Sequence, residues 1–212
     1  LDPARFISNR SSGKMGVLLA QAAKLRGANV DIVHGPMQIG SNWLEGLNVF
    51  PVRNAEEMQK SISFLQDKAD VIAMTAAITD LRTSNGMCPE KKPKNLLIKS
   101  LAKNIEETPD LLQAINSRKK SNQFIVGFSA LTGSDEEIKS KGEAKRISKG
   151  CDLLFANPID RPGQGFEENF NGGFLLSAEN SPKAIQTSTK SCLAHKLLDS
   201  IHQYRCEIFQ KV

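Results

Sequence analysis

Residues 6–16 (FISNRSSGKMG) combine a short apolar segment, a polar turn containing glycine and the opening of a helix. Ser11, Ser12 and Gly13 allow the backbone to turn and to leave N–H groups directed outward. These groups and the positive end of the helix dipole favour an anion, typically a phosphate. Asn9, at the end of the apolar segment, could hydrogen-bond a ligand held there. The spacing is neither G-x-G-x-x-G nor a P-loop, so a plain strand–turn–helix connection with a serine N-cap is the alternative.

A second candidate region is Met74-Thr75-Ala76-Ala77-Ile78-Thr79-Asp80, which follows an apolar run. Small residues at the carboxyl end of a strand let a ligand lie against the backbone. Asp80 would face that crevice, although an aspartate that caps a turn is the common alternative.

Two groups of lysines could bind anions. Residues 90–94 (EKKPK) lie in a Gly/Pro/Lys-rich segment, 81–95, which could close over phosphates as a lid loop carrying mobile charges. A solvated loop is the alternative. Lys145 and Lys149 are four residues apart on a charged helix and share one face. Like charges placed in this way repel each other unless an anion or a carboxylate lies between them.

The segment Thr108-Pro109-Asp110 predicts the start of another helix, with Thr108 as N-cap and Pro109 as the first helical residue. The amides of Asp110, Leu111 and Leu112 would then lie at a helix N-terminus. Such amides make a further site for an anion or a polar ligand.

Strands and helices must position these candidate site residues. Along the chain, short apolar runs alternate with segments of helical periodicity. Strands are expected at residues 5–8, 29–34, 47–52, 71–77, 96–101, 124–128 and 153–157. Helices are expected at residues 13–26, after Asn54, after Thr108, at 136–149 and at 191–209, with a β-hairpin at 173–177 and 185–187. The pattern predicts one α/β domain over 1–212, a Rossmann-like, doubly wound and mostly parallel sheet with helices on both faces. Gly16, one turn into the first helix, permits close helix–strand packing.

The composition limits the class of protein. The chain has 212 residues, 40% of them hydrophobic, and a net charge of +5 that comes from scattered lysines. No nucleic-acid-binding signature and no apolar run of about 20 residues is present, so neither nucleic acid nor a membrane is expected as a partner. The four cysteines are widely spaced, which argues against a zinc site or a disulfide framework and favours a reducing, cytoplasmic location.

The quoted blocks together resemble one family. Asp2-Pro3-x-Arg5-x-Ile7-Ser8-Asn9-x-Ser11-Ser12-Gly13-Lys14-Met15-Gly16 is similar to the opening signature of phosphopantothenoylcysteine synthetase. Further matching blocks follow in family order: Ala76-Ala77-x-x-Asp80, Pro89-Glu90-Lys91, Thr108-Pro109-Asp110, Val126-Gly127-Phe128, Lys145 to Lys149, Asp152 to Asn157 and Gly165-Phe166. In bacteria this synthetase is the C-terminal half of a bifunctional coenzyme A biosynthesis flavoprotein of the DNA/pantothenate metabolism family.

The resemblance implies a homodimeric, CTP-dependent ligase. The carboxylate of 4′-phosphopantothenate would attack the α-phosphate of CTP and release pyrophosphate. The amine of cysteine would then attack the acyl-cytidylate, giving phosphopantothenoylcysteine and CMP. Mg²⁺ would accompany the triphosphate, with its ligands unassigned. The abrupt start of the chain fits a preceding phosphopantothenoylcysteine decarboxylase domain, and FMN would belong to that domain alone.

The resemblance also implies roles for individual residues. Asn9 would hold the activated acyl group, and Lys91 would stabilise the negative charge that develops in both half-reactions. The nucleotide would be bound by Ser11, Ser12, Gly13, Lys14, Met74, Thr75, Ala76, Asp80, Lys91, Pro109, Asp110, Leu111, Leu112, Phe128, Lys145 and Lys149.

Two departures from the family pattern bear on activity. The family's Lys-Ile-Lys-Lys is Lys91-Lys92-Pro93-Lys94 here, and its Phe-Ala-Ala-Glu-Thr is Phe128-Ser129-Ala130-Leu131-Thr132. They keep open the alternative of a non-catalytic nucleotide-binding or dimerisation domain. A short-chain dinucleotide oxidoreductase fits poorly, because its glycine motif and its Tyr-x-x-x-Lys pair are missing. The preference for cytosine rests on the resemblance alone.

Overall fold

The computed structural model describes residues 1–178 and 180–209, which fold into two compact units. Unit 1 combines Leu1–Arg10 with Ala77–Asp110, and unit 2 combines Ser11–Ala76 with Leu111–Val212. Each unit is described by itself.

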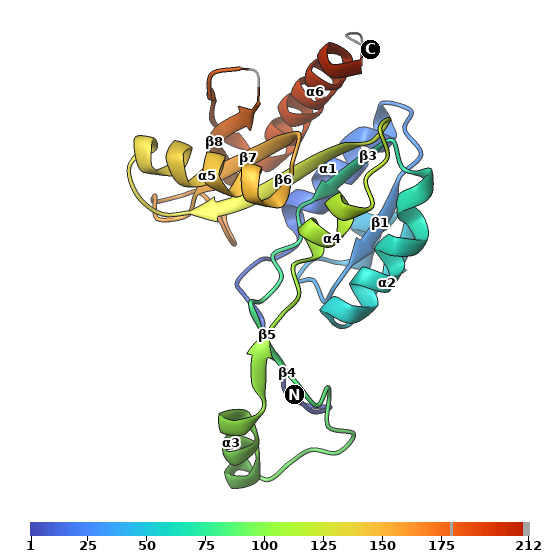
Figure 1. Cartoon of the computed structure of the whole chain (residues 1–212), viewed down its shortest axis with the longest axis vertical. Coiled ribbons are helices and arrows are strands. Elements are labelled where there is room, and N and C mark those ends of the chain that lie inside the picture. Colours follow the sequence, from blue (N-terminus) through green and yellow to red (C-terminus); the bar gives the residue numbers. More distant parts are fainter. Residues whose placement is uncertain (179, 210–212) are drawn as a thin grey trace. The chain divides into compact units, whose positions relative to one another are not determined.

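The centre of unit 2 is a five-stranded sheet with the order β3-β6-β7-β8-β9 (Figure 1). Its strands are β3 (Val71–Met74), β6 (Phe124–Leu131), β7 (Leu153–Pro158), β8 (Phe170–Ser177) and β9 (Lys183–Thr189). β3, β6 and β7 are parallel, whereas β8 and β9 form an antiparallel hairpin at the edge. The hairpin predicted from the sequence is therefore confirmed.

A separate parallel pair is formed by β1 (Asp31–His34) and β2 (Asn48–Pro51). The short 3₁₀ helix η1 (Ser41–Leu44) lies in their connection, and η2 (Gln66–Lys68) precedes β3. Unit 2 thus has its parallel strands in two sheets.

The described residues of unit 2 form five α-helices: α1 (Lys14–Leu25), α2 (Ala55–Leu65), α4 (Leu111–Ser117), α5 (Asp135–Lys149) and α6 (Lys190–Phe209). α1 and α6 cover one face of the five-stranded sheet, while α4 and α5 pack on the other. The predicted cap of α2 is confirmed, because the side chain of Asn54 accepts a hydrogen bond from the Glu57 amide.

Alternate residues of the central strands enter two different cores. Phe124 and Val126 of β6 pack with α1 and α6, whereas Ile125 between them packs with α4 and α5. The strand period of two explains this division. It also explains why β6 and β7 read as continuous apolar runs, since both of their faces are buried. The predicted Rossmann-like architecture with helices on both faces is confirmed.

Unit 1 contains an antiparallel pair, β4 (Leu81–Thr83) and β5 (Ile105–Glu107), and one helix, α3 (Lys94–Lys103). The N-terminal residues join it, since the Cys88 amide donates to the Leu1 carbonyl over 3.0 Å.

Two predicted strands were wrong, and one predicted helix begins later than expected. Residues 5–8 form no strand beyond an isolated bridge between Asp2 and Arg5. Residues 96–101, predicted as a strand, lie within α3. The helix expected after Thr108 begins only at Leu111, because the Thr108 amide donates to the Asp80 carbonyl and extends the β4–β5 pairing. No helix among residues 1–178 and 180–209 is long and apolar enough to cross a membrane.

Candidate nucleotide-binding site

The polar turn before α1 has the geometry of an anion-binding turn. Gly13 is the N-cap of α1, with a left-handed φ of 79°, and no side chain caps the helix among the described residues. The first turn of α1 contains no acidic residue. The serine N-cap considered as an alternative is therefore wrong. Ser12 lies one residue earlier, and its Oγ is 3.4 Å from the Lys14 amide nitrogen.

The first turn of α1 lies against the carboxyl end of β3, next to the neighbouring strand β6 and to α4. A Cβ on Gly16 would lie 2.5 Å from Oγ1 of Thr75, the residue after β3, so the close helix–strand packing predicted for Gly16 is confirmed. Met74 at the end of β3 pairs with Gly127 of β6, next to Phe128. Leu112 of α4 also lies against Gly127. Unit 2 thus brings the turn, residues 74–75, Leu112 and Phe128 to one edge of the sheet.

Lys14 extends over unit 2 from the first position of α1. Its Nζ donates to Oδ1 of Asn169 over 2.6 Å and lies 5.4 Å from the centre of the Trp43 ring. These contacts fix a positive charge directly after the turn.

We expect Gly13→Ala to lower stability and to abolish phosphate binding by the turn. An alanine in left-handed backbone costs about 1–2 kcal/mol. Its Cβ would also lie 2.8 Å from Met37 Cγ, and such overpacking adds about 1–3 kcal/mol. Urea denaturation and a titration with inorganic pyrophosphate measure the two effects.

Gly46→Ala is the matched control for this prediction. Gly46 has a similar φ of 74° but nothing within 4 Å of the added Cβ, so it isolates the backbone strain. Equal destabilisation of both variants would contradict the packing role of Met37. Unchanged pyrophosphate binding in Gly13→Ala would contradict the phosphate role of the turn.

The remaining predicted residues of unit 2 lie on α4, β6 and α5 and in the segment after β3. Leu111 is buried in the core, so only its backbone is left for a ligand. The Phe128 ring packs edge-on against Phe155, with 5.7 Å between ring centres. Lys145 is exposed, and Lys149 is half-buried one helical turn later on α5. Ala76, the last residue of this part of unit 2, is exposed.

Unit 1 contains Asn9, Asp80, Lys91, Pro109 and Asp110. The side-chain amide of Asn9 donates a hydrogen bond to the Ala77 carbonyl, which joins the N-terminal segment to the segment after β3. Asp80 is exposed, as is Pro109, and both Pro109 and Asp110 precede the first turn of α4. The helix-start geometry predicted for Pro109 and Asp110 is therefore wrong.

A buried carboxylate anchors the lysine loop of unit 1. The side chain of Asp2 has no exposed surface and accepts hydrogen bonds from the Ala4 amide, the Lys92 amide and the Arg5 guanidinium. Arg5 also donates to the Lys92 carbonyl over 2.6 Å. The hydrogen bond from Arg5 lowers the pKa of Asp2 from 3.8 to about 2, so this carboxylate is ionised at neutral pH.

This anchor fixes the backbone on one side of Lys91, whose own side chain is exposed. The sequence analysis quoted Asp2 and Arg5 as part of a signature but gave neither of them a role. Their spacing of three residues, which suits a local ion pair, was the available signal.

The two departures from the family pattern have structural reasons. Pro93 is the N-cap of α3, with a φ of −54°, so it begins a helix at the end of the lysine loop. Leu131 ends β6 and is 8% exposed within the core beneath α5. An apolar residue is therefore suited to position 131, and neither change removes a predicted ligand-binding side chain.

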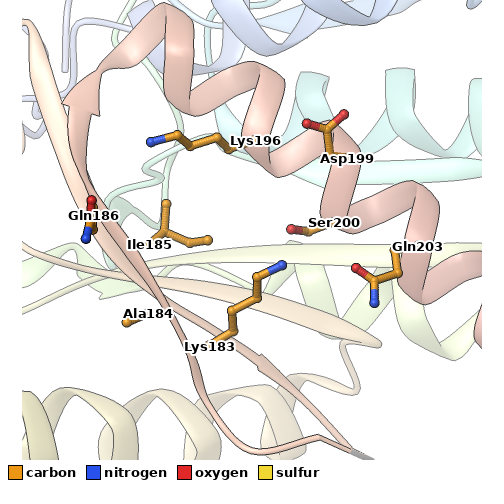
Figure 2. A pocket seen from close by; sticks show the side chains of 8 residues that line it. All are labelled: Lys183, Ala184, Ile185, Gln186, Lys196, Asp199, Ser200 and Gln203. Carbon is orange, nitrogen blue, oxygen red and sulfur yellow. The ribbon is translucent and has the colours of Figure 1, made fainter.

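A shallow pocket of about 280 Å³ lies elsewhere on unit 2, between β9 and α6 (Figure 2). Its labelled side chains include Lys183, Lys196 and Asp199. Lys196 donates to Ser188 and Asp199 pairs with Arg26, so both of these charges are engaged. The pocket contains none of the predicted site residues.

The chain matches the family of the DNA/pantothenate metabolism flavoprotein C-terminal domain over residues 1–204, and it belongs to this family. The Coenzyme A biosynthesis bifunctional protein CoaBC of Escherichia coli (strain K12) is 34% identical over 202 residues, which are 95% of this chain and 48% of that protein. The chain thus spans about half the length of the curated relatives it matches.

Solved structures agree with the fold. The crystal structure of the C-terminal domain of CoaBC has a TM-score of 0.72 and 27% identity, covering 95% of this chain and 89% of that chain. A Cab2 mutant in complex with phosphopantothenate-cysteine has a TM-score of 0.70 and 12% identity, covering 98% and 82%. At this low identity, the second likeness shows the fold alone.

Proposed function

We propose that this chain is a ligase of coenzyme A biosynthesis that joins 4′-phosphopantothenate and cysteine with CTP. The observation that carries the proposal is the turn from Ser11 to Lys14, which opens α1 without an acidic residue at the carboxyl edge of the parallel strands. Helix N-termini at this edge are where α/β sheets bind phosphates. The similarity to CoaBC and to its C-terminal domain supports a role in coenzyme A biosynthesis.

In the first half-reaction, a carboxylate oxygen of 4′-phosphopantothenate forms a bond to the α-phosphorus of CTP, and the bond to pyrophosphate breaks. In the second, the cysteine amine attacks the acyl carbon and CMP leaves. In unit 2, the turn and Lys14 hold phosphate oxygens, and Lys145 and Lys149 supply further positive charge. In unit 1, Lys91 neutralises developing negative charge and Asn9 holds the acyl group.

Mg²⁺ has no protein cage in the described residues, because no group of three or more His, Cys, Asp or Glu side chains could hold a metal ion there. Mg²⁺ commonly keeps several waters and binds through substrate phosphates. We therefore assign its coordination mainly to the triphosphate and water, and we derive no step from it.

We also propose that the chain forms a homodimer through unit 1. This small unit exposes a large number of apolar side chains: Phe6, Ile7, Leu81, Met87, Leu96, Ile98 and Ile105. Apolar surface of this kind marks an interaction site. Sedimentation equilibrium tests the proposal, and a monomer at micromolar concentration would contradict it. A preceding decarboxylase domain that binds FMN in the full-length protein is a further proposal, supported by the half-length match to CoaBC.

The deciding experiment measures pyrophosphate release from the purified chain with 4′-phosphopantothenate. CTP and ATP are compared, each with and without cysteine. We expect release with CTP, and phosphopantothenoylcysteine only when cysteine is present. If the folded chain binds CTP but releases no pyrophosphate, the alternative of a nucleotide-binding or dimerisation domain is correct. Release with ATP at the same rate would contradict the cytosine preference.

A further inference from the structure

Lys190, the first residue of α6, is the most deeply buried lysine of the described chain, with 4% of its surface exposed. No hydrogen bond or ion pair of its ammonium group is found among residues 1–178 and 180–209, although this nitrogen is not one of the fully buried atoms that lack a partner. Lysine is rarely buried without a partner, because desolvation of its charge is costly. The negative charge of Glu168 has only a small opposing effect on the pKa of Lys190.

The strand register places Lys190 at the same edge of the sheet as the polar turn. Ala156 near the end of β7 pairs with Phe174 of β8, and Phe170 at the start of β8 pairs with Thr189 at the end of β9. β9 therefore ends where the parallel strands end, and α6 begins there. Lys190 follows Thr189 directly and shares this edge with the turn before α1.

α1 and α6 lie side by side and run in the same direction. At the far end of α1, Arg26 pairs with Asp199 in the middle of α6 over 2.7 Å. At their near ends, both helices contact Asn169: Lys14 Nζ donates to its Oδ1 over 2.6 Å, and the Lys190 amide donates to its carbonyl over 2.9 Å. Two helix N-termini therefore lie together, and neither has an acidic residue in its first turn. Aligned N-termini add their positive ends.

The electrostatics of Lys190 agree with this arrangement. Burial lowers the pKa of its ammonium, the positive charge of Lys14 lowers it further, and Glu168 opposes the change. Protonation of Lys190 is therefore less favoured than that of a solvated lysine, and an anion placed beside it would relieve both the desolvation and the repulsion.

We propose that Lys190 and Lys14 form a phosphate-binding pair at the joint N-termini of α1 and α6, and that Lys190 is a further binding residue for a phosphate group of a substrate. This inference rests on the proposed function for the identity of the substrates. The ligand chemistry is a phosphate monoester or diphosphate, which belongs either to the nucleotide or to 4′-phosphopantothenate. Lys14 keeps its bond to Asn169 in the structure, so Lys190 supplies the uncompensated charge.

The test is Lys190→Met in the whole chain, with calorimetric titration of inorganic pyrophosphate, CTP, 4′-phosphopantothenate and pantothenate. We expect affinity for one phosphate source to fall about 10- to 100-fold, as for the loss of a hydrogen bond to a charged group. A loss for pyrophosphate and CTP assigns the nucleotide. A loss for 4′-phosphopantothenate, with pantothenate unchanged, assigns the substrate phosphate.

Thermal unfolding supplies a second readout, because methionine replaces a largely buried lysine whose charge has no ion-pair partner among the described residues. We expect the melting temperature of Lys190→Met to rise by about 2–4 °C. Lys196→Met is the matched control: this half-buried lysine is on the same helix and donates to Ser188, and its loss should change no phosphate affinity.

The outcomes separate the two proposals. One outcome is that Lys190→Met releases pyrophosphate from CTP normally and binds all four titrated compounds as tightly as Lys196→Met does. In that case the phosphate-binding role of Lys14 and Lys190 is wrong, while the ligase proposal stands. If the wild-type chain binds added pyrophosphate through Lys190 but does not produce pyrophosphate from CTP, the ligase proposal is wrong. The phosphate-binding role of Lys14 and Lys190 then stands. A wild-type chain that binds none of the phosphate probes contradicts the pair directly.

Discussion

Lys91→Gln is expected to lower the rate of CTP-dependent pyrophosphate release by about 10²- to 10³-fold, the usual effect of removing one group that stabilises charge in a transition state. The side chain of Lys91 is exposed, so its replacement leaves the folded structure intact. The backbone beside it is fixed by Asp2 and Arg5, so the lysine is presented from an anchored loop. Steady-state kinetics at saturating CTP measure the effect on kcat.

Lys94→Gln is the matched control for Lys91→Gln. Lys94 is an exposed lysine three residues later, at the first position of α3. Its replacement by glutamine removes the same charge from the same segment. We expect its kcat to stay within about twofold of wild type, as for a surface charge that makes no specific contact. Equal losses in the two variants would show that only the general positive charge of the segment matters, which contradicts the specific role of Lys91.

The sequence predicted the elements of unit 2 well because their signals are local. The cap Asn54, the long apolar runs of β6 and β7, and the alternation between strands and helices each follow from neighbouring residues. Which side chains meet at the carboxyl edge of the sheet was harder to predict from the sequence. That Gly16 touches Thr75 follows from the spacing of small residues, but that Lys190 shares their edge depends on the hairpin register.

Unit 1 was predicted poorly, because its structure depends on partners distant in sequence. Residues 96–101 are an apolar run of a length that fits either a strand or a helix. Pro93, the N-cap of α3, was the available signal for a helix that begins at residue 94. Thr108 has the residue type of an N-cap, but its amide is used by the Asp80 carbonyl, and no local pattern announces that bond.

The division into two units was also not visible in the sequence. The blocks around Asn9–Gly13, Ala76–Asp80 and Pro109–Leu112 each read as one continuous signature, yet each contributes residues to both units. A signature records which residues occur together along the chain. It does not record which compact unit each of them joins, because that depends on packing against distant segments.

Asn9→Asp is expected to uncouple the two half-reactions. Asn9 is the residue assigned to hold the activated acyl group, and its amide donates to the Ala77 carbonyl. Aspartate keeps the size but removes the donor, and its negative charge opposes an anionic acyl-cytidylate. We expect formation of phosphopantothenoylcysteine to fall by about 10²- to 10³-fold, while pyrophosphate release falls less. The ratio of pyrophosphate to ligated product, one in a coupled enzyme, should therefore rise.

The same measurement separates a role in chemistry from a structural role. Loss of the bond between Asn9 and Ala77 also loosens unit 1, so thermal unfolding of Asn9→Asp is compared with that of Asn9→Ala, which removes the same donor without adding charge. If the two variants unfold alike but only Asn9→Asp uncouples the products, the added charge acts on the intermediate. If both products fall together in both variants and the ratio stays at one, Asn9 acts only by holding the backbone, and its assignment to the acyl group is wrong.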